Sequence, residues 1–184
     1  MSGVDLPAGT YLRHLTAHSD DRGEFTEVHR REWPSGVEPV QWNCVRSRAG
    51  TLRGVHVHAK HADYLTCPVG QCFVGLRDLR RGPTAGQTAM VELSADRPAG
   101  LTIPPGVAHG FYFPVDSLHL YAVDRYFDPA DELGCHWADP ALELDWPGVP
   151  MLLSRRDRDA GPLAELLTRI ERWQPFGPIV RVAS

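Results

Sequence analysis

Four side chains that can bind protons or metal ions occur in two short segments of the chain. The first segment, residues 52–63, contains His56, His58 and Asp63, and the second places His109 after a Pro-Pro-Gly turn. Side chains alternate between the two faces of a β-strand, so His56 and His58 point to the same side. Imidazole transfers protons near neutral pH and also binds divalent metals. The pattern therefore predicts a site inside a β-structure.

The spacing of these segments resembles the sequence patterns of the cupins, which are small double-sheet β-barrels of the jelly-roll type. The first pattern consists of Gly50, His56, His58, Asp63 and Gly70, and the second of Pro104, Gly106 and His109. An aspartate stands where the first pattern usually has glutamate. A lone histidine on a strand is more often a packed core or rim residue, but two patterns in register favour a common pocket. The resemblance implies an all-β cupin or jelly-roll barrel.

The length and the hydrophobic pattern favour one domain spanning residues 1–184. Its 184 residues, 42% of them hydrophobic, suffice for a single buried core. Short strand-like runs recur between turn signals, as in an all-β sandwich or barrel. They cover residues 9–15, 23–29, 40–45, 64–67, 72–79, 88–93, 100–103, 110–113 and 117–123. Apolar residues at helical spacing predict one short C-terminal helix over about 162–173 that packs against the barrel.

Composition and charge narrow the class of partner. The net charge is −4, with 19 Lys and Arg against 23 Asp and Glu mixed along the chain, which argues against a nucleic-acid or acidic-membrane surface. Residues 1–8 lack the features of a signal peptide, and no apolar run is long enough to span a membrane. Four cysteines form no Cys-x-x-Cys pair, so we expect reduced, structural thiols. We therefore expect a soluble cytoplasmic protein with a small-molecule partner.

From about residue 19 to 166 the sequence resembles the dTDP-4-dehydrorhamnose 3,5-epimerase family, whose members are nucleotide-sugar epimerases built on the cupin barrel. The matching pieces follow the family's order with nearly its spacing, and the whole set makes the match specific. They include Asp21 to Phe25 with Glu27, Gln41 with Asn43, Leu52 to His56, Asp78 to Arg80, Ile103 to Phe111, Leu120 with Tyr121, Tyr126 to Pro129, Trp137 to Pro140, Asp145 to Pro147, and Leu153 with Ser154 and Asp157.

This resemblance implies a reaction at C3, C5 or both of a nucleoside-diphospho 4-keto-6-deoxyhexose, with dTDP as the expected nucleotide, in deoxysugar biosynthesis. A base removes the hydrogen that the ketone acidifies, an enolate forms, and an acid returns a proton to the opposite face. The resemblance implies that His56 is the base and Tyr121 the acid. It also implies that the Asp157 carboxylate orients the imidazole.

Binding roles follow from the same resemblance. Arg53 is expected to meet the diphosphate or the ring, because a guanidinium suits phosphate oxygens. The positions implied to line the substrate site are Arg22, Phe25, Glu27, Gln41, Asn43, Arg53, His58, Asp63 and His109. The family also implies a homodimer in which residues 1–18 exchange strands and some lining residues cross the interface.

One position departs from the family in a way that changes the chemistry. Where the family has a lysine that bears enolate charge, this chain has Asp63, and a carboxylate beside a developing oxyanion is repulsive. In one explanation a divalent ion is held as in metal cupins, by His56, His58, Asp63 and His109. In the other the site is metal-free and Asp63 pairs with His58 or Arg53. We expect no metal and no cofactor, because His56 cannot easily be both ligand and proton acceptor.

Three other functions stay open. A nucleotide-sugar 3,4-ketoisomerase shares the Arg-Gly-x-His-x-His stretch and works through an enediol, although the pieces around Tyr121, Trp137 and Asp157 favour the epimerase. A metal-dependent cupin oxygenase or isomerase is the second alternative. A non-catalytic barrel that binds sugar nucleotides is the third. The residues do not choose the sugar, its base or the inverted centre.

Overall fold

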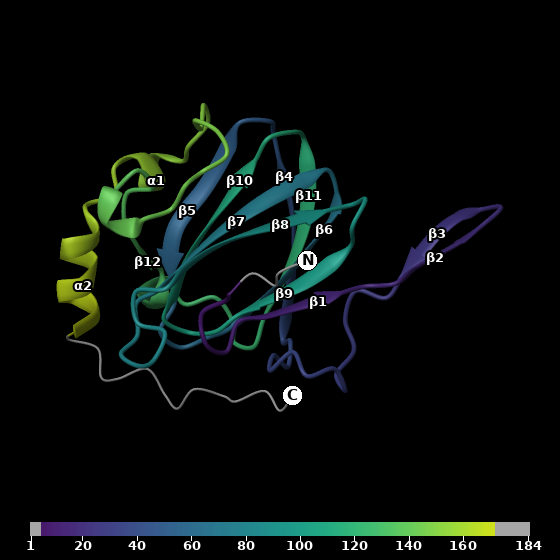
Figure 1. Ribbon diagram of the computed structural model, residues 1–184, viewed down its shortest axis with the longest axis horizontal. Helices are drawn as coiled ribbons and strands as arrows, with labels where there is room; N and C mark the ends of the chain where they lie inside the picture. Colours follow the sequence, from purple (N-terminus) through teal and green to yellow (C-terminus); the bar gives the residue numbers. More distant parts are fainter. Residues whose placement is uncertain (1–4, 172–184) are drawn as a thin grey trace.

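The computed structural model describes residues 5–171 and contains two five-stranded antiparallel sheets that face each other (Figure 1). One sheet has the strand order β1-β9-β6-β11-β4 and the other β12-β5-β10-β7-β8, so the chain crosses repeatedly between them. This connectivity confirms the all-β jelly-roll barrel of the cupin type. The strands are β1 (Tyr11–His14), β2 (Ala17–Asp20), β3 (Gly23–Thr26), β4 (Gln41–Ser47), β5 (Thr51–Val57), β6 (Asp63–Val69), β7 (Gln71–Asp78), β8 (Thr88–Ser94), β9 (Ala99–Ile103), β10 (Val107–Phe113), β11 (Ser117–Val123) and β12 (Leu133–Gly134).

Apolar side chains fill one half of the space between the sheets. In β7, Cys72, Val74 and Leu76 are buried at alternate positions, as expected for a strand with one face on a core. They belong to one cluster with Leu93 of β8 and Leu101 of β9. Full burial of such a side chain contributes about 1.5–3 kcal/mol. The core thus lies toward β7, β8 and β9, and the other half of the barrel, toward β4, β5 and β11, contains a cavity.

A second apolar cluster covers the outer face of β5. Helix α2 (Leu163–Glu171) buries Leu166 and Ile170, whose four-residue spacing places them on one side, in a cluster that includes Val55 of β5. The predicted helix is confirmed from residue 163 to 171, and its last two predicted residues, 172–173, lie outside the described residues. Among residues 5–171 no helix is long and apolar enough to cross a membrane.

Three short helical turns connect the later strands, and each begins with a side-chain cap. Asp128, Asp139 and Ser154 each accept a hydrogen bond from a backbone N–H of the turn that follows. Such caps fix the direction in which the chain enters the turn. The turns are η1 (Pro129–Asp131), η2 (Pro140–Leu142) and α1 (Arg155–Arg158).

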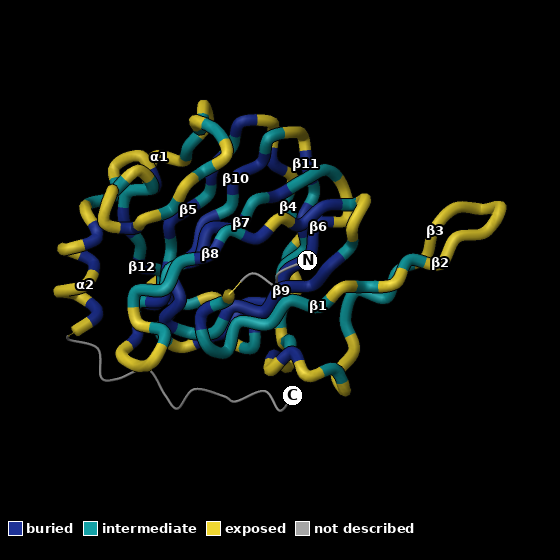
Figure 2. Tube along the Cα trace, in the orientation of Figure 1, coloured by how far each residue is buried: buried dark blue, intermediate teal, exposed yellow. Residues whose placement is uncertain are grey.

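Strands β2 and β3 form a hairpin that extends away from the barrel, at the right of Figure 1, and most of it is exposed in Figure 2. Strand β1, just before it, pairs with β9 of the same chain, with Tyr11 opposite Thr102. In the segment 1–18, for which we expected strand exchange, β1 therefore has its partner within the chain, and residues 1–4 lie outside the described part. The hairpin is the part that reaches outward.

Strand β5 accommodates one extra residue beside the cavity. Arg53 pairs with Phe111 of β10 and His56 with His109, so three steps along β5 match two along β10. Gly54 takes up the irregularity with φ +120°, and a Cβ there would lie 2.8 Å from the β10 backbone, so glycine is required. Because this bulge absorbs one step of the alternation, Arg53 and His56 face the same cavity.

The four cysteines, all within the described residues, are free. Cys67, Cys72 and Cys135 are buried, and Cys44 is exposed. Burial raises the pKa of Cys67 to about 11 and that of Cys135 to about 12, so these thiols stay protonated and pack as small apolar groups.

Candidate active site

A cavity of about 260 Å³ lies between β4, β5, β11 and the turn that carries α1. Nine of the twelve residues that the sequence predicted for the site line it. They are His56, Asp157, Tyr121, Gln41, Asn43, Arg53, His58, Asp63 and His109. The fold thus brings together groups from both sheets and from the C-terminal segment.

His56 and Asp157 form a hydrogen-bonded pair at one side of the cavity. The His56 Nε2–H donates to Asp157 Oδ1 at 2.7 Å. Asp157 lies on α1, whose cap Ser154 accepts a hydrogen bond from the Asp157 backbone N–H at 3.1 Å. The cap holds the backbone of the turn, and the side-chain hydrogen bond holds the imidazole.

The segment before α1 is attached to the start of β5 by backbone hydrogen bonds. The Met151 N–H donates to Gly50 O at 2.9 Å, and the Leu52 N–H donates to Leu152 O at 3.0 Å. A carboxylate that is 101 residues away from His56 in the chain is thereby brought beside it.

The Asp157 carboxyl keeps its charge although its side chain is only 4% exposed. Burial pushes its pKa upward, but the hydrogen bond and the charge interaction with His56, together with a hydrogen bond from Ser154, outweigh burial and leave the pKa below the usual value. The carboxylate fixes a proton on His56 Nε2 and so leaves the lone pair on Nδ1. This is the arrangement of a general base.

Tyr121 projects from β11 into the same cavity and holds its proton firmly. Burial, and then the nearby carboxyl groups of Asp63 and Glu132, raises the pKa of the phenol. Its ring centroid lies 6.0 Å from that of His119, which stacks in turn on Phe113 at 5.1 Å. A protonated phenol held in this way can donate to carbon or to an oxygen that gains charge.

Polar groups of β4 and β5 line another part of the cavity. The Arg53 guanidinium donates to Ser47 Oγ at 3.0 Å and to Arg46 O at 3.3 Å, and Gln41 Nε2 donates to Asn43 Oδ1 at 2.9 Å. A guanidinium has five N–H donors, so those that remain can bind phosphate oxygens.

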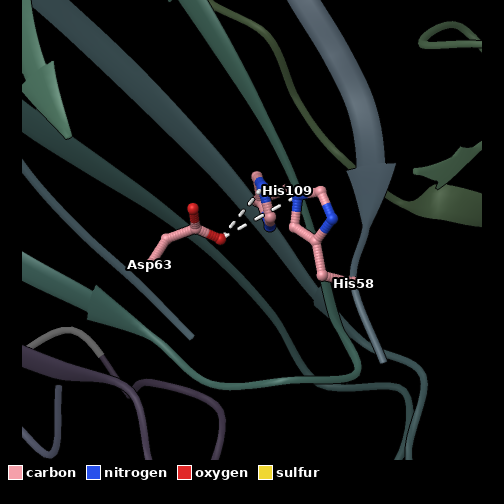
Figure 3. A group of neighbouring side chains, drawn as sticks. All are labelled: His58, Asp63 and His109. Atoms are coloured by element: carbon pink, nitrogen blue, oxygen red, sulfur yellow. Dashed lines mark ion pairs between the residues drawn. The ribbon is translucent and has the colours of Figure 1, made fainter. Parts of the chain in front are cut away.

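Three histidines and one aspartate form a buried cluster in the cavity wall, and Figure 3 shows three of its members. His58, His61 and His109 turn Nε2 toward the Asp63 carboxylate, with N–O distances of 4.0, 3.9 and 3.8 Å. The sequence reasoning missed His61. The signal was present, because His61 is the third histidine within six residues and lies two residues before Asp63.

Each ring of this cluster is oriented by a hydrogen bond from its Nδ1. The His58 Nδ1–H donates to Asp131 O at 3.1 Å, and the His61 Nδ1–H donates to Asp131 Oδ2 at 3.0 Å. The His109 Nδ1–H donates to Val107 O at 3.1 Å. These donors set the tautomer, so each Nε2 carries a lone pair that faces Asp63.

Burial keeps the imidazoles of His58 and His109 neutral. It lowers the pKa of His58 to about 4, with a further lowering by His61, and it lowers the pKa of His109 well below its usual value. Burial also raises the pKa of Asp63 well above its usual value, and the Glu132 carboxylate adds to this effect. Neutral imidazoles with free lone pairs are the form that binds metal ions.

The structure changes two expectations about Asp63. Its contact with His58 is a long one of 4.0 Å, and Arg53 is bonded to β4 instead. The group of neighbouring ligand atoms consists of His58, Asp63 and His109 and does not include His56, which the alternative metal set contained. His61 also lies beside Asp63, with its Nε2 3.9 Å from a carboxylate oxygen.

Three predicted substrate contacts do not line the cavity of their own chain. Arg22 and Phe25 lie on the projecting hairpin and Glu27 just after it; Phe25 is 63% exposed. Arg22 pairs with Asp20 and Glu27 with Arg30. The hairpin extends outward, away from the sheets that form the cavity. Their role as substrate contacts therefore stays a prediction that requires the hairpin of a second copy.

Comparisons with known proteins identify the family. A family model described as dTDP-4-dehydrorhamnose 3,5-epimerase matches residues 7–165. The chain belongs to this epimerase family. The epimerase of that name from Pseudomonas aeruginosa is 38% identical over 157 residues, which cover 79% of this chain and 86% of that protein. The dTDP-4-dehydrorhamnose 3-epimerase of Streptomyces niveus is 39% identical over 157 residues, covering 80% of this chain and 76% of that protein.

Solved structures of such epimerases share the fold over nearly the whole chain. The rmlC epimerase of Mycobacterium tuberculosis has a TM-score of 0.83 at 32% identity and covers 94% of this chain and 92% of its own. ChmJ, a 3'-monoepimerase from Streptomyces bikiniensis in complex with dTDP-quinovose, has a TM-score of 0.82 at 30% identity and covers 90% and 89%. The part that matches the epimerase family model includes both His56 and Asp157.

Proposed function

We propose that this member of the epimerase family inverts C3, C5 or both of a dTDP-linked 4-keto-6-deoxyhexose in deoxysugar biosynthesis. The observation that carries the proposal is the 2.7 Å hydrogen bond between His56 and Asp157 in a cavity that Tyr121 also lines. Similarity of sequence and fold to 3,5-epimerases and to a 3-epimerase supports the reaction class.

The reaction starts at a carbon next to the C4 ketone. The ketone acidifies the hydrogen there, because the electron pair left on carbon delocalises onto the ketone oxygen as an enolate. His56 Nδ1 takes the proton, and the Asp157 carboxylate stabilises the imidazolium that forms. Tyr121 then gives its proton to the opposite face of the carbon, which restores the ketone and inverts the centre. The imidazolium then loses its proton to solvent, and the phenolate regains one from solvent.

The nucleotide end of the substrate is assigned to the polar part of the cavity. Arg53 offers N–H groups to the diphosphate, and its hydrogen bonds to β4 fix the guanidinium before the ligand arrives. ChmJ, which shares the fold, was solved with dTDP-quinovose, and this supports dTDP as the nucleotide.

Proton NMR in deuterium oxide tests the proposal with a dTDP-4-keto-6-deoxyhexose as substrate. We expect deuterium to enter C3, C5 or both while the ketone stays at C4. His56→Asn should abolish this wash-in, whereas His14→Asn, on an exposed position of β1, should leave it unchanged. A 3-keto product would identify a ketoisomerase, and binding without any wash-in would identify a non-catalytic barrel.

The same experiment counts the inverted centres. The relatives include 3,5-epimerases and a 3-epimerase, so family membership is compatible with either outcome. Two deuterons per product molecule indicate inversion at both carbons, and one deuteron identifies a single centre by its position on the ring.

We further propose a homodimer in the cytoplasm, in which the hairpin of one copy reaches the cavity of the other. Arg22 and Phe25, which resemble substrate contacts of the family, lie on this outward hairpin, and the edge strand β4 exposes Trp42 by 45%. Free cysteines are compatible with a reducing compartment.

Light scattering and subunit mixing test the dimer. A His56→Asn copy and a Phe25→Ala copy are each expected to be impaired, and their mixture should regain activity because one cavity in the mixed dimer is intact. A monomeric mass, or a mixture no more active than its parts, would contradict the shared site. Cell fractionation tests the compartment.

A further inference from the structure

The cluster of His58, His61, His109 and Asp63 has features that the proposed proton transfers do not use. Imidazole nitrogens of His58, His61 and His109 lie 3.8–4.0 Å from the Asp63 carboxylate, and Figure 3 shows the rings of His58 and His109. We propose that His58, Asp63 and His109 bind one divalent transition-metal ion beside His61 and that, in the proposed epimerase reaction, this ion accepts charge from the ketone oxygen. The second part rests on the proposed function, whereas the binding of the ion does not.

The distances suit an ion held by His58, Asp63 and His109, whereas His61 belongs to a separate group with His58 and Asp131. The ligand atoms of His58, Asp63 and His109 all lie within 4.8 Å of one another, and each Nε2 lies 3.8–4.0 Å from a carboxylate oxygen. Bonds of about 2.0–2.2 Å to a tetrahedral ion place ligand atoms about 3.4 Å apart. Side-chain movements of a few tenths of an ångström therefore close the site around an ion.

The hydrogen bonds of the rings prepare them as ligands. In each of the three histidines Nδ1–H donates to an oxygen, to Asp131 for two rings and to Val107 O for His109. Metal-bound histidines in general donate their other ring N–H to a carboxylate or a carbonyl, because this fixes the ring and raises its basicity. Here that outer set of acceptors is already in place.

The surroundings of the Asp63 carboxyl group are a second observation that favours a cation. The residue is 6% exposed, and its carboxyl oxygens lie 3.8–4.0 Å from three imidazole nitrogens, which is beyond hydrogen-bond distance. A buried carboxylate without close donors is costly unless it binds a proton or a cation. The three nitrogens around it favour the cation, because a proton on Asp63 would satisfy at most one of them.

This ligand set leaves His56 free for proton transfer. His56 is not in the group of neighbouring ligand atoms, so the conflict between ligand and base does not arise. Asp63 and Tyr121 line the same cavity, which places the ion near the groups that handle the substrate. Two imidazoles and one carboxylate suit Zn²⁺, Mn²⁺, Fe²⁺, Co²⁺ or Ni²⁺ and leave a position for the ketone oxygen.

Metal binding is measured on the full chain after removal of metals with a chelator. Elemental analysis after reconstitution should give one equivalent, titration calorimetry with Zn²⁺ and Mn²⁺ should show one site, and Co²⁺ should give ligand-field absorption bands. Less than about a tenth of an equivalent of every metal and no Co²⁺ bands would overturn the proposal and leave Asp63 protonated.

Three variants test the ligand set, with circular dichroism to check that each is folded. His109→Asn and Asp63→Asn should each lower the affinity for Co²⁺ at least tenfold and change the absorption bands. His56→Asn is the matched control, because it removes an imidazole of the same cavity and should keep one equivalent. Loss of the ion in His56→Asn with retention in His109→Asn would overturn this ligand set.

Deuterium wash-in with and without the ion tests its role. We expect the reconstituted protein to exchange on the order of tenfold faster than the metal-free protein, or more. Equal rates would overturn the charge-accepting role. Absence of wash-in in both forms, with one equivalent of metal bound, would overturn the proposed function and the role together while the metal site stands.

Discussion

His56 and His58 are two residues apart at the end of one strand, yet their surroundings differ. The His56 side chain is 19% exposed and hydrogen-bonded to an ionised carboxylate. His58 is buried deeper, has its pKa lowered to about 4, and faces the carboxyl group of Asp63 at 4.0 Å. Alternation along β5 directs both side chains to the cavity, and the partner of each ring then decides its chemistry. His56 has a carboxylate within hydrogen-bond distance and is placed to act as a base. His58 instead belongs to a group of side chains that can bind a metal ion.

The two regions are also attached to the barrel differently. The partner of His56 comes from the C-terminal turn α1, whereas the histidine cluster is supported by η1 and β10. Changes in one region should therefore leave the other largely intact, and the following predictions test this independence.

The largest effect is expected from His56→Asn. Asparagine cannot take a proton, so kcat for wash-in should fall about 10⁴-fold, the upper end of what one general base contributes. Stopped-flow or NMR rates measure the loss. Residual activity within tenfold of the parent would mean that the base belongs to another residue.

Asp157→Asn should have the next largest effect and reduce kcat about 10³-fold. The amide no longer stabilises the imidazolium and can hold the wrong tautomer of His56. Metal content should stay at one equivalent if the two regions are independent. Loss of the metal along with the activity would break the comparison.

Tyr121→Phe should separate proton removal from inversion. Without the phenol, formation of inverted product should fall about 10²-fold, while exchange by His56 on its own face falls much less. The ratio of exchanged to inverted sugar by NMR gives the answer. Equal losses of both would show that Tyr121 does not supply the second proton.

The smallest effect concerns the stability of the fold in acid, and it depends on His119 in the wall of the cavity. Burial lowers the pKa of His119 from 6.5 to about 4, so between these values the unfolded chain binds the proton and the folded chain does not. The free energy of unfolding should therefore be at its full value above pH 6.5 and fall as pH drops toward 4, by on the order of 2–3 kcal/mol for this ring. The Asp157 contribution is lost below its unfolded pKa of 3.8, in a separate window.

Urea unfolding of metal-free protein between pH 4 and 7 measures this slope. His119→Leu should make it less steep, because leucine has no proton to gain while His58 and His109 still contribute, and His18→Leu on the exposed hairpin is the control. An unchanged slope in His119→Leu would assign the acid sensitivity to other groups.

The sequence was sufficient for the barrel because turn signals and alternating side chains are local. The run predicted at 117–123 coincides with β11, and the helix was confirmed over residues 163–171. Alternation alone would separate Arg53 from His56, and only the bulge at Gly54 returns them to one face. That bulge depends on β10, a strand about fifty residues away in the chain, so it could not be read from β5 alone.

The candidate site could be predicted only in part, because several of its contacts also depend on segments that are far apart in the chain. Asp157 lies in a charged turn that composition alone would assign to solvent, and only the family resemblance indicated it. His61 and Asp131 were missed because both lie in connections, where no strand pattern tells the direction of a side chain. The hairpin contacts Arg22 and Phe25 require knowledge of a second copy.

Backbone hydrogen bonds act as a clamp between β5 and the segment before the C-terminal turn α1. Met151 and Leu152 donate to Gly50 O, and Leu52 donates to Leu152 O. His56 lies four residues after Leu52, and Asp157 lies five residues after Leu152, so both side chains are close in sequence to the clamp. Fluctuations that tilt this end of the barrel carry the two side chains together. The proton-transfer pair can thus keep its alignment when this end of the barrel moves.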